Sequence, residues 1–332
     1  MITRREFLRA AAVLGGIPAL SLVPALAAAE APAQHSDQAP GFFRFYVGDV
    51  EVTALYDGSG LVPSGMLHGA PPARMAGLME DAGLDPEVGE PISINAFLLN
   101  TGDQLVLVDA GCGAAMGPTA GFLPANLRAA GYAPEQVDAV LLTHLHPDHA
   151  LGLADPDGRA LFPRAVVRPS KAEADYWLSD ERLASASEGH QALEKSASFL
   201  TGLRAAMDPY SGRLRPFAPG EAPAVGVAAE PLPGHTPGHC GFRVSSRDQS
   251  LLIFGDTMHC PAVQLFLPSV SVEFDVDQEA AVATRLPLLS RLDEESCWVA
   301  AAHMPFPGLG GIRARDEGYA WLPVPYTPTP RG

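Results

Sequence analysis

Four potential metal ligands crowd into six residues near the middle of the chain. The segment His144-Leu145-His146-Pro147-Asp148-His149 holds three imidazoles and one carboxylate. It follows directly on the apolar run 137–143, which predicts a buried strand ending at the first histidine. Imidazole nitrogen and carboxylate oxygen are the ligands that Zn²⁺ and similar divalent ions take. Because a strand-end loop can point successive side chains to different sides, one such loop can serve two metal ions.

Three further candidates stand later in the chain, each after a predicted strand. His235 lies in a Gly/Pro turn, Asp256 follows Gly255, and His303 follows the apolar run 298–302. Taken alone, each has a structural explanation as a loop histidine, a turn carboxylate or a buried hydrogen-bonded histidine. Behind the six-residue cluster their order favours ligands, and the two oxygens of Asp256 suit a bridge between two cations.

Two other histidines and the cysteines carry weaker signals. His239 is expected to support the site from outside, and His259 has no ligand pattern of its own. The cysteines are widely spaced without a CxxC pair, which excludes a zinc finger or a thioredoxin-like centre. Four buried thiols are the simplest interpretation, and one disulfide is left open if the protein is exported. The cysteines are Cys112, Cys240, Cys260 and Cys297.

The elements that must position these side chains alternate between strands and helices. Strands are predicted over 42–47, 50–56, 92–99, 105–108, 137–143, 165–167, 225–232, 241–244, 251–254 and 298–302, the last of them running into His303. Helices are predicted over 124–130, 171–178 and 277–292, with a helical insert at about 180–207. An early β-meander followed by mixed segments indicates sheets packed together with helices outside.

Composition limits the partners. The 332 residues are 47 % apolar and 18 % charged, so the chain can bury a large core and is not disordered. The formal charge of −16 is unsuited to nucleic acid or anionic lipid. The protein is therefore not expected to bind nucleic acid or an anionic membrane. Whether the chain forms a homodimer is left open.

The N-terminal segment has the features of an export signal. Arg4 and Arg5 precede a weakly apolar run over 10–29, and Ala25-Leu26-Ala27 fits a cleavage site. Gly and Pro interrupt that run, which disfavours a stable membrane anchor. We expect a twin-arginine (Tat) signal peptide over 1–27, a flexible leader over 28–40 and a catalytic domain over 41–332. The Tat translocon would then be a partner, and the mature protein would be periplasmic or secreted.

The order HxHxDH, His, Asp, His resembles that of the metallo-β-lactamase superfamily. Flanking segments are similar to the methyl parathion hydrolase-like family, which includes organophosphate hydrolases and lactone or aryl-ester hydrolases. The likeness covers essentially all of 39–326. It rests on 39–45, 48–49, 54–55, 57–58, 105–111, 131–132, 134–138, 172–178, 306–308, 318–319 and 323–324.

The resemblance implies an αββα sandwich with the site at one edge of the two sheets. It also implies two divalent metal ions, zinc first, with manganese, cobalt or iron as alternatives. One ion would be held by His144, His146 and His235, the other by Asp148, His149 and His303, with Asp256 between them. Asp109, in a strand-end D-x-G turn, would orient the ligand loop without binding metal.

The resemblance also marks a substrate pocket. Trp177 and Phe199 match aromatic positions of the family's pocket, although helix packing explains both residues almost equally well. Met116 stands where the organophosphate hydrolase has a Phe, so one aromatic wall is missing. This departure favours lactone or aryl-ester hydrolysis over efficient phosphotriester turnover.

The chemistry that two such ions offer is hydrolysis. Two close cations lower the pKa of a bridging water toward neutrality, and the resulting hydroxide attacks a carbonyl carbon or phosphorus while one cation stabilises the oxyanion. A β-lactamase usually lacks the bridging Asp256, and a nuclease would need a basic surface. A redox member would use iron. A non-catalytic exported binding protein would be expected to lack some of the seven ligands.

Overall fold

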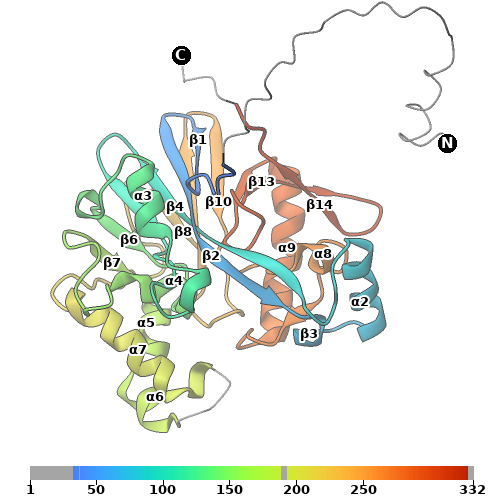
Figure 1. Cartoon of the computed structure of the whole chain (residues 1–332), viewed down its shortest axis with the longest axis horizontal. Coiled ribbons are helices and arrows are strands. Elements are labelled where there is room, and N and C mark those ends of the chain that lie inside the picture. The colour runs from blue at the N-terminus through green and yellow to red at the C-terminus, as the bar shows by residue number, and fades with distance from the viewer. Residues whose placement is uncertain (1–32, 37, 188–192, 328–332) are drawn as a thin grey trace, which may run out of the picture. The chain divides into compact units, whose positions relative to one another are not determined.

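Two six-stranded sheets face each other in the computed structural model, which describes residues 33–36, 38–187 and 193–327 (Figure 1). Both sheets belong to the compact unit that begins at Pro40. In spatial order the first sheet is β1 (Phe42–Val47), β2 (Val50–Val62), β4 (Glu90–Asn100), β5 (Leu105–Val108), β6 (Ala139–Leu141) and β7 (Val166–Arg168). The second is β14 (Tyr319–Pro323), β13 (Leu309–Ala314), β12 (Trp298–Ala300), β10 (Gln249–Ile253), β9 (Cys240–Ser246) and β8 (Val227–Pro231). A small third sheet pairs β3 (Leu67–His68) with β11 (Ser271–Val272).

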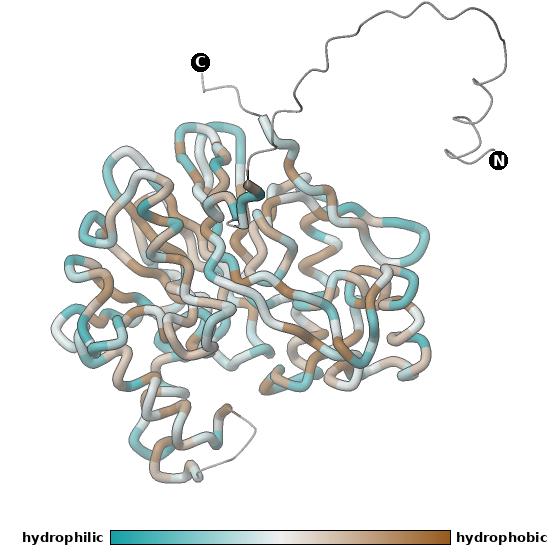
Figure 2. Tube along the Cα trace, in the orientation of Figure 1, coloured by the Kyte–Doolittle hydropathy of each residue, from teal (hydrophilic) through white to brown (hydrophobic). Residues whose placement is uncertain are grey.

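Alternation along the strands divides the core into layers. In β5, Leu107 packs toward the outer helices, whereas Val106 and Val108 pack between the two sheets. In β10, Ile253 lies between the sheets and Leu252 lies on the opposite face. Figure 2 shows the corresponding apolar stretches along the strands and polar stretches along the loops. Both sheets are therefore covered on both faces.

Helices close the outer faces. The helices α3 (Leu123–Ala129), α5 (Lys171–Trp177) and α7 (Ala197–Met207) pack on the first sheet, and α9 (Gln278–Glu295) packs on the second (Figure 1). The order helix, sheet, sheet, helix confirms the predicted αββα sandwich. The remaining helices are α2 (Pro72–Asp81), α4 (Pro147–Ala150), α6 (Asp180–Ser185) and α8 (Pro261–Gln264).

Strand direction explains where the site lies. In the first sheet β5 runs parallel to β6, and in the second β10 runs parallel to β12. Asp109, His144, Asp256 and His303 follow these four strands within a few residues. The carboxyl ends of parallel strands meet at one edge of a sheet, and ligands of open α/β sheets bind outside that edge. The two sheets bring these edges together.

Several sequence predictions need correction. The strand predicted over 137–143 covers only Ala139–Leu141, because Val137 closes a 3₁₀ turn through a hydrogen bond to the Pro134 carbonyl. The strand before His303 is not the last, since β13 and β14 follow it. The helix α2 and the strands β3 and β11 were not predicted either. The strands β3 and β11 have two residues each, too few for a periodic signal. In α2, Met75, Leu78 and Met79 do have helical spacing, a signal that the sequence reasoning overlooked.

The insert over 180–207 contains α6, the short 3₁₀ turn Leu193–Lys195 and α7, with 188–192 outside the described residues. The predicted signal segment 1–27 lies outside them, as do residues 28–32 and 37 of the predicted leader. In the described part of the chain no helix is long and apolar enough to span a bilayer. All four cysteines are buried and free of disulfide bonds.

Candidate metal centre

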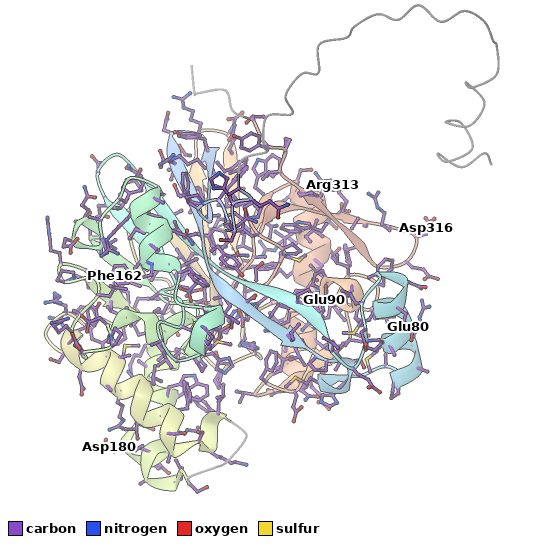
Figure 3. All side chains as sticks on the ribbon, in the orientation of Figure 1. Glu80, Glu90, Phe162, Asp180, Arg313 and Asp316 are labelled. Carbon is purple, nitrogen blue, oxygen red and sulfur yellow. The ribbon has the colours of Figure 1, made fainter. Side chains whose placement is uncertain are left out.

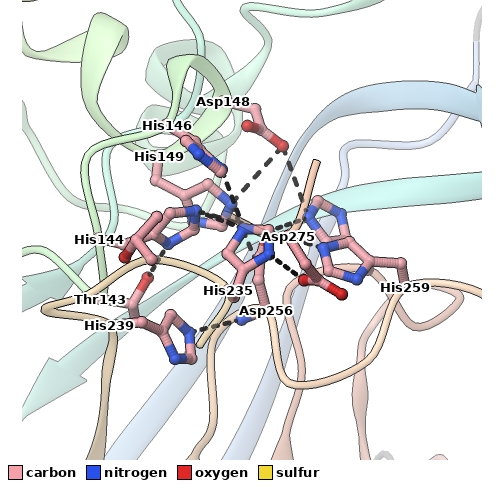
Figure 4. Close-up of polar contacts among 12 residues, drawn as sticks. Thr143, His144, His146, Asp148, His149, His235, His239, Asp256, His259 and Asp275 are labelled. Atoms are coloured by element: carbon pink, nitrogen blue, oxygen red, sulfur yellow. Dashed lines mark hydrogen bonds and ion pairs between the residues drawn. The ribbon is translucent and has the colours of Figure 1, made fainter. Parts of the chain in front are cut away.

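The seven predicted ligands converge around one carboxylate, that of Asp256 (Figure 4). The loop after β6 supplies His144 and His146, and the first turn of α4 supplies Asp148 and His149. The other three come from the second half of the chain. They are His235 after β8, Asp256 after β10 and His303 after β12.

The first group joins three imidazoles. His235 Nε2 lies 2.9 Å from His146 Nδ1 and 3.2 Å from His144 Nε2. Asp256 Oδ2 lies 3.2 Å from His235 Nε2 and 3.5 Å from His144 Nε2. These atoms, all buried, lie within 4.8 Å of one another and can hold one metal ion.

The second group adds a carboxylate. Asp148 Oδ2 is 3.5 Å from both His149 Nε2 and His303 Nε2. His303 Nε2 is also 3.0 Å from Asp256 Oδ2, and His149 Nε2 is 3.1 Å from Asp256 Oδ1. Asp256 thus contacts both groups, since Oδ2 faces His144 and His235 of the first group and Oδ1 faces His149 of the second, as a bridging carboxylate requires.

In three of the ligand histidines, Nδ1, the ring nitrogen that points away from the centre, is hydrogen-bonded to an acceptor. His149 Nδ1 pairs with Asp109 at 2.9 Å, and His303 Nδ1 donates to the Ser93 carbonyl at 2.8 Å. His235 Nδ1 pairs with Asp275 at 2.8 Å. Because Nδ1–H donates outward, the lone pair of Nε2 points to the centre. This is the outer hydrogen bonding that metal-binding histidines have.

Asp109 lies where the D-x-G turn predicts, next to the ligand loop and outside the ligand groups. Its carboxylate accepts from the Thr143 backbone at 2.8 Å and from the Thr143 hydroxyl, in addition to its contact with His149. Its φ of 62° is a left-handed conformation that costs a non-glycine residue about 1–2 kcal/mol. The backbone is held there by a hydrogen bond from Asp109 to the Leu141 carbonyl.

His239 supports the bridging residue. Its Nδ1 donates to the Leu232 carbonyl at 2.7 Å, and its Nε2 accepts from the Asp256 backbone at 2.9 Å. Burial lowers the pKa of His239 to about 3, so the ring is neutral and can accept that hydrogen bond. Its position outside the ligand groups agrees with the role expected from the sequence.

The carboxylates set the potential at the centre. Burial lowers the pKa of His144 and His146 well below the usual value, which keeps both rings neutral. Burial also acts to lower the pKa of His149 and His235, but Asp256 and neighbouring carboxylates outweigh it and raise the pKa. The site therefore stabilises positive charge. Divalent cations supply that charge while leaving the imidazole lone pairs available.

Two buried polar atoms test whether the residues fit a metal ion. His149 Nε2 and Asp256 Oδ1 make no hydrogen bond, although they are buried and 3.1 Å apart. An unsatisfied buried polar group costs about 1–3 kcal/mol. Both are atoms of the kinds that bind metal ions. His149 Nε2 belongs to the second group, and Asp256 Oδ1 faces that group. The donor set thus fits divalent cations, and the identity of the metal is left open.

Sequence reasoning missed two contributors and assigned no role to a third, His259. Asp275 and Glu173 are buried carboxylates that contact the ligand loops, and His259 Nε2 lies 3.1 Å from Asp256 Oδ2. The ring of His259 stacks on His303 with centroids 5.0 Å apart. Asp275 stands 40 residues beyond His235. No spacing rule connects such positions, so only the fold reveals them.

The structure separates the three predicted pocket residues. Trp177 is buried and meets the edges of His146 and Phe199, each with ring centroids 5.5 Å apart. Both aromatic residues belong to the core layer under the first sheet, and Trp177 is the one that contacts His146. Met116 is 42 % exposed, and among the described residues it belongs to none of the apolar clusters.

Access to the centre is on the side of one ligand. The side chain of Asp148 is 19 % exposed, whereas the other six ligands are at most 4 % exposed. Among the seven predicted ligands, Asp148 is therefore the one that faces solvent.

Comparison with known proteins agrees with this geometry. The hydrolase AbOPH, of the β-lactamase superfamily, has a structure similar to this chain at a TM-score of 0.82 and 35 % identity, covering 88 % of this chain and all of that one. AidC, a dizinc quorum-quenching lactonase solved with the product N-hexanoyl-L-homoserine, has a TM-score of 0.76 and 25 % identity over 86 % of this chain and 98 % of its own.

A probable metal-dependent hydrolase from Staphylococcus aureus shares the fold at a TM-score of 0.66 and 19 % identity, over 85 % of this chain and all of its own. No curated protein matches the chain. The family model of the metallo-β-lactamase superfamily matches residues 89–294. With its αββα sandwich, its His/Asp clusters and these similarities, the chain belongs to the metallo-β-lactamase superfamily.

Proposed function

We propose that the protein is an exported, binuclear metal-dependent hydrolase that cleaves lactones or aryl esters. The observation that carries the proposal is the complete set of seven His and Asp ligands around Asp256. When bound, two divalent ions would activate a water molecule and polarise the scissile carbonyl. A non-catalytic scaffold has no need for all seven.

The protein's own residues supply orientation and charge. Asp256 faces both ligand groups and keeps them adjacent. Asp109 and Asp275 hold the rings of His149 and His235 with Nε2 inward. The indole of Trp177 closes the side of His146, which leaves the approach past Asp148 for substrate.

One similarity and one feature of this chain support the substrate class. AidC, a lactonase, was solved with a lactone-derived product, and its chain aligns over 86 % of this one. The exposed Met116 offers no aromatic face of its own. Phosphotriester hydrolysis as the main activity is the alternative, since a polarised phosphoryl oxygen resembles a polarised carbonyl.

The test is a hydrolysis panel with the metal content measured on the same preparation. The panel holds lactones, aryl esters, phosphotriesters, a cephalosporin and S-lactoylglutathione. Asp256→Asn, purified identically, reports any contaminating hydrolase. We expect lactones or aryl esters to have the highest kcat/KM. A higher value for phosphotriesters would support the alternative, and two bound metals without any turnover would support a non-catalytic binding protein.

A further inference from the structure

One buried carboxylate outside the ligand groups joins the two loops that carry the first group. Glu173 Oε1 accepts from the Leu145 backbone at 3.0 Å, and Leu145 stands between His144 and His146. Glu173 Oε2 accepts from the Thr236 hydroxyl at 2.8 Å and from the Gly238 backbone at 2.9 Å, beside His235. The loops are about ninety residues apart in the chain.

The carboxylate is fully engaged by donors. The fourth donor is Trp177 Nε1, 2.6 Å from Oε1, so each oxygen accepts two hydrogen bonds. Burial raises the pKa of Glu173, and the four donors oppose that rise because each one stabilises the anion. Only the carboxylate form accepts all four. A neutral amide at this position would turn an N–H toward one pair of donors.

The backbone of the His235 loop packs directly against the backbone of α5 at Glu173. A Cβ on Gly238 would lie 2.2 Å from the Glu173 nitrogen, so the second loop can reach α5 only with glycine there. Ser170, the residue before α5, donates to the Gly238 carbonyl at 2.8 Å. The start of α5 therefore binds both the N–H and the carbonyl of Gly238 in the His235 loop.

The second ligand group does not depend on this link. His149 is oriented by Asp109, and His303 by the Ser93 carbonyl. Asp148 lies in the first turn of α4. None of these contacts passes through α5, so a change at Glu173 should affect the two groups unequally.

We propose that Glu173 is a positioning residue that sets the separation of the two loops carrying His144, His146 and His235. It touches neither substrate nor metal and acts through Leu145, Thr236 and Gly238. Through Trp177 it also fixes the aromatic wall beside His146. The inference rests on the proposed function in one respect, namely that the wild-type centre binds two ions.

The experiment measures zinc retained by the full chain during dialysis against buffers of graded free Zn²⁺. In Glu173→Gln we expect one of the two equivalents to bind about 10–100-fold more weakly, as for other residues that orient metal ligands, while the second equivalent is unchanged. Asp175→Asn is the matched control. That carboxylate lies on the same helix, is exposed and pairs with Lys171 at 2.6 Å, so we expect both equivalents unchanged.

A second variant keeps the test decisive if Glu173→Gln fails to fold. Thr236→Val removes one of the four donors, and we expect a smaller weakening of the same single equivalent. Unchanged binding of both ions, or equal weakening of both, overturns the proposal in whichever variant folds. If the wild type binds less than one ion, the proposed function fails instead.

Discussion

Glu90 should make the protein less stable as the pH rises, and Glu90→Gln should remove that effect. Glu90 is the first residue of β4, is 7 % exposed and accepts from the Ala262 backbone at 3.1 and 3.2 Å. Ala262 lies in α8, just beyond the loop that carries Asp256. Burial raises the pKa of Glu90 from 4.5 to about 7, against the opposing effect of the Ala262 hydrogen bond.

The direction in which stability changes with pH follows from the number of protons that each state binds. Because the folded-state pKa of Glu90 is the higher one, the folded chain binds more protons than the unfolded chain between pH 4.5 and about 7. The contribution is full below pH 4.5 and is lost as the pH rises through about 7. A shift of this size corresponds to about 3 kcal/mol at about 1.4 kcal/mol per pH unit. Most of this loss of stability occurs between pH 5 and pH 8.

The assay is urea unfolding of wild type and Glu90→Gln at pH 5 and pH 8, with metal removed from both proteins. A glutamine oxygen can still accept from Ala262, so the two should be close in stability at pH 5. At pH 8 the variant should be more stable by about 2–3 kcal/mol. Glu80, exposed on α2, provides the control Glu80→Gln, for which no such change is expected (Figure 3). An equal difference at both pH values would refute the reasoning.

Four further predictions concern the centre and export. Asp256→Ala should lower kcat more than His239→Ala at equal protein concentration, because only the first removes the shared carboxylate; equal losses would contradict this. Chelation should lower the Tm and zinc should restore it. At a free zinc concentration of 100 times the Kd, each bound ion stabilises the folded protein by about 2.7 kcal/mol. Met116→Phe should raise kcat/KM about two- to twelve-fold for aryl phosphotriesters, through offset stacking of about 0.5–1.5 kcal/mol, and less for aliphatic lactones. Arg4→Lys with Arg5→Lys should leave precursor in the cytoplasm, and normal export of that double variant in cell fractions would argue against a twin-arginine signal.

The layered fold was predictable because its signals are local. Apolar runs marked the strands around the site, and the early β-meander is confirmed by the antiparallel pairs β1–β2 and β4–β5. The late helix was placed to within a residue at its start, since Asp277 caps α9 by accepting from Ala280. The hairpin β13–β14 was missed because Gly310 and Gly311 break the alternation that indicates a strand.

The metal ligands could be predicted from the sequence, whereas the carboxylates around them could not. Four ligands fall within six residues, so type and spacing coincide in one loop. Glu173 has no such signature. Ser170 and Glu173 have the spacing of a helix-capping pair, and Ser170 does accept from the Glu173 backbone at 3.1 Å. The Glu173 side chain turns to the ligand loops instead, a choice made by tertiary contacts that the local sequence does not encode.

The charges of the centre explain why the outer residues matter. Asp148 and Asp256 bring negative charge as ligands, and Asp109, Glu173 and Asp275 bury more of it around them. Buried charge is costly unless it is paired. Arg285, buried on α9 and donating to the Thr257 carbonyl, lies in the field of Asp275. Two divalent ions would offset the other four carboxylates.

This balance makes metal binding and folding depend on the same residues. The outer carboxylates stabilise the positive charge of bound ions, and bound ions in turn remove the cost of burying those carboxylates. A substitution of an outer carboxylate should therefore destabilise the metal-loaded protein more than the metal-free protein, because the repulsion relieved in the metal-free protein opposes the cost of the unpaired donors. Equal losses of stability in the loaded and metal-free forms would instead indicate a residue that only packs the core.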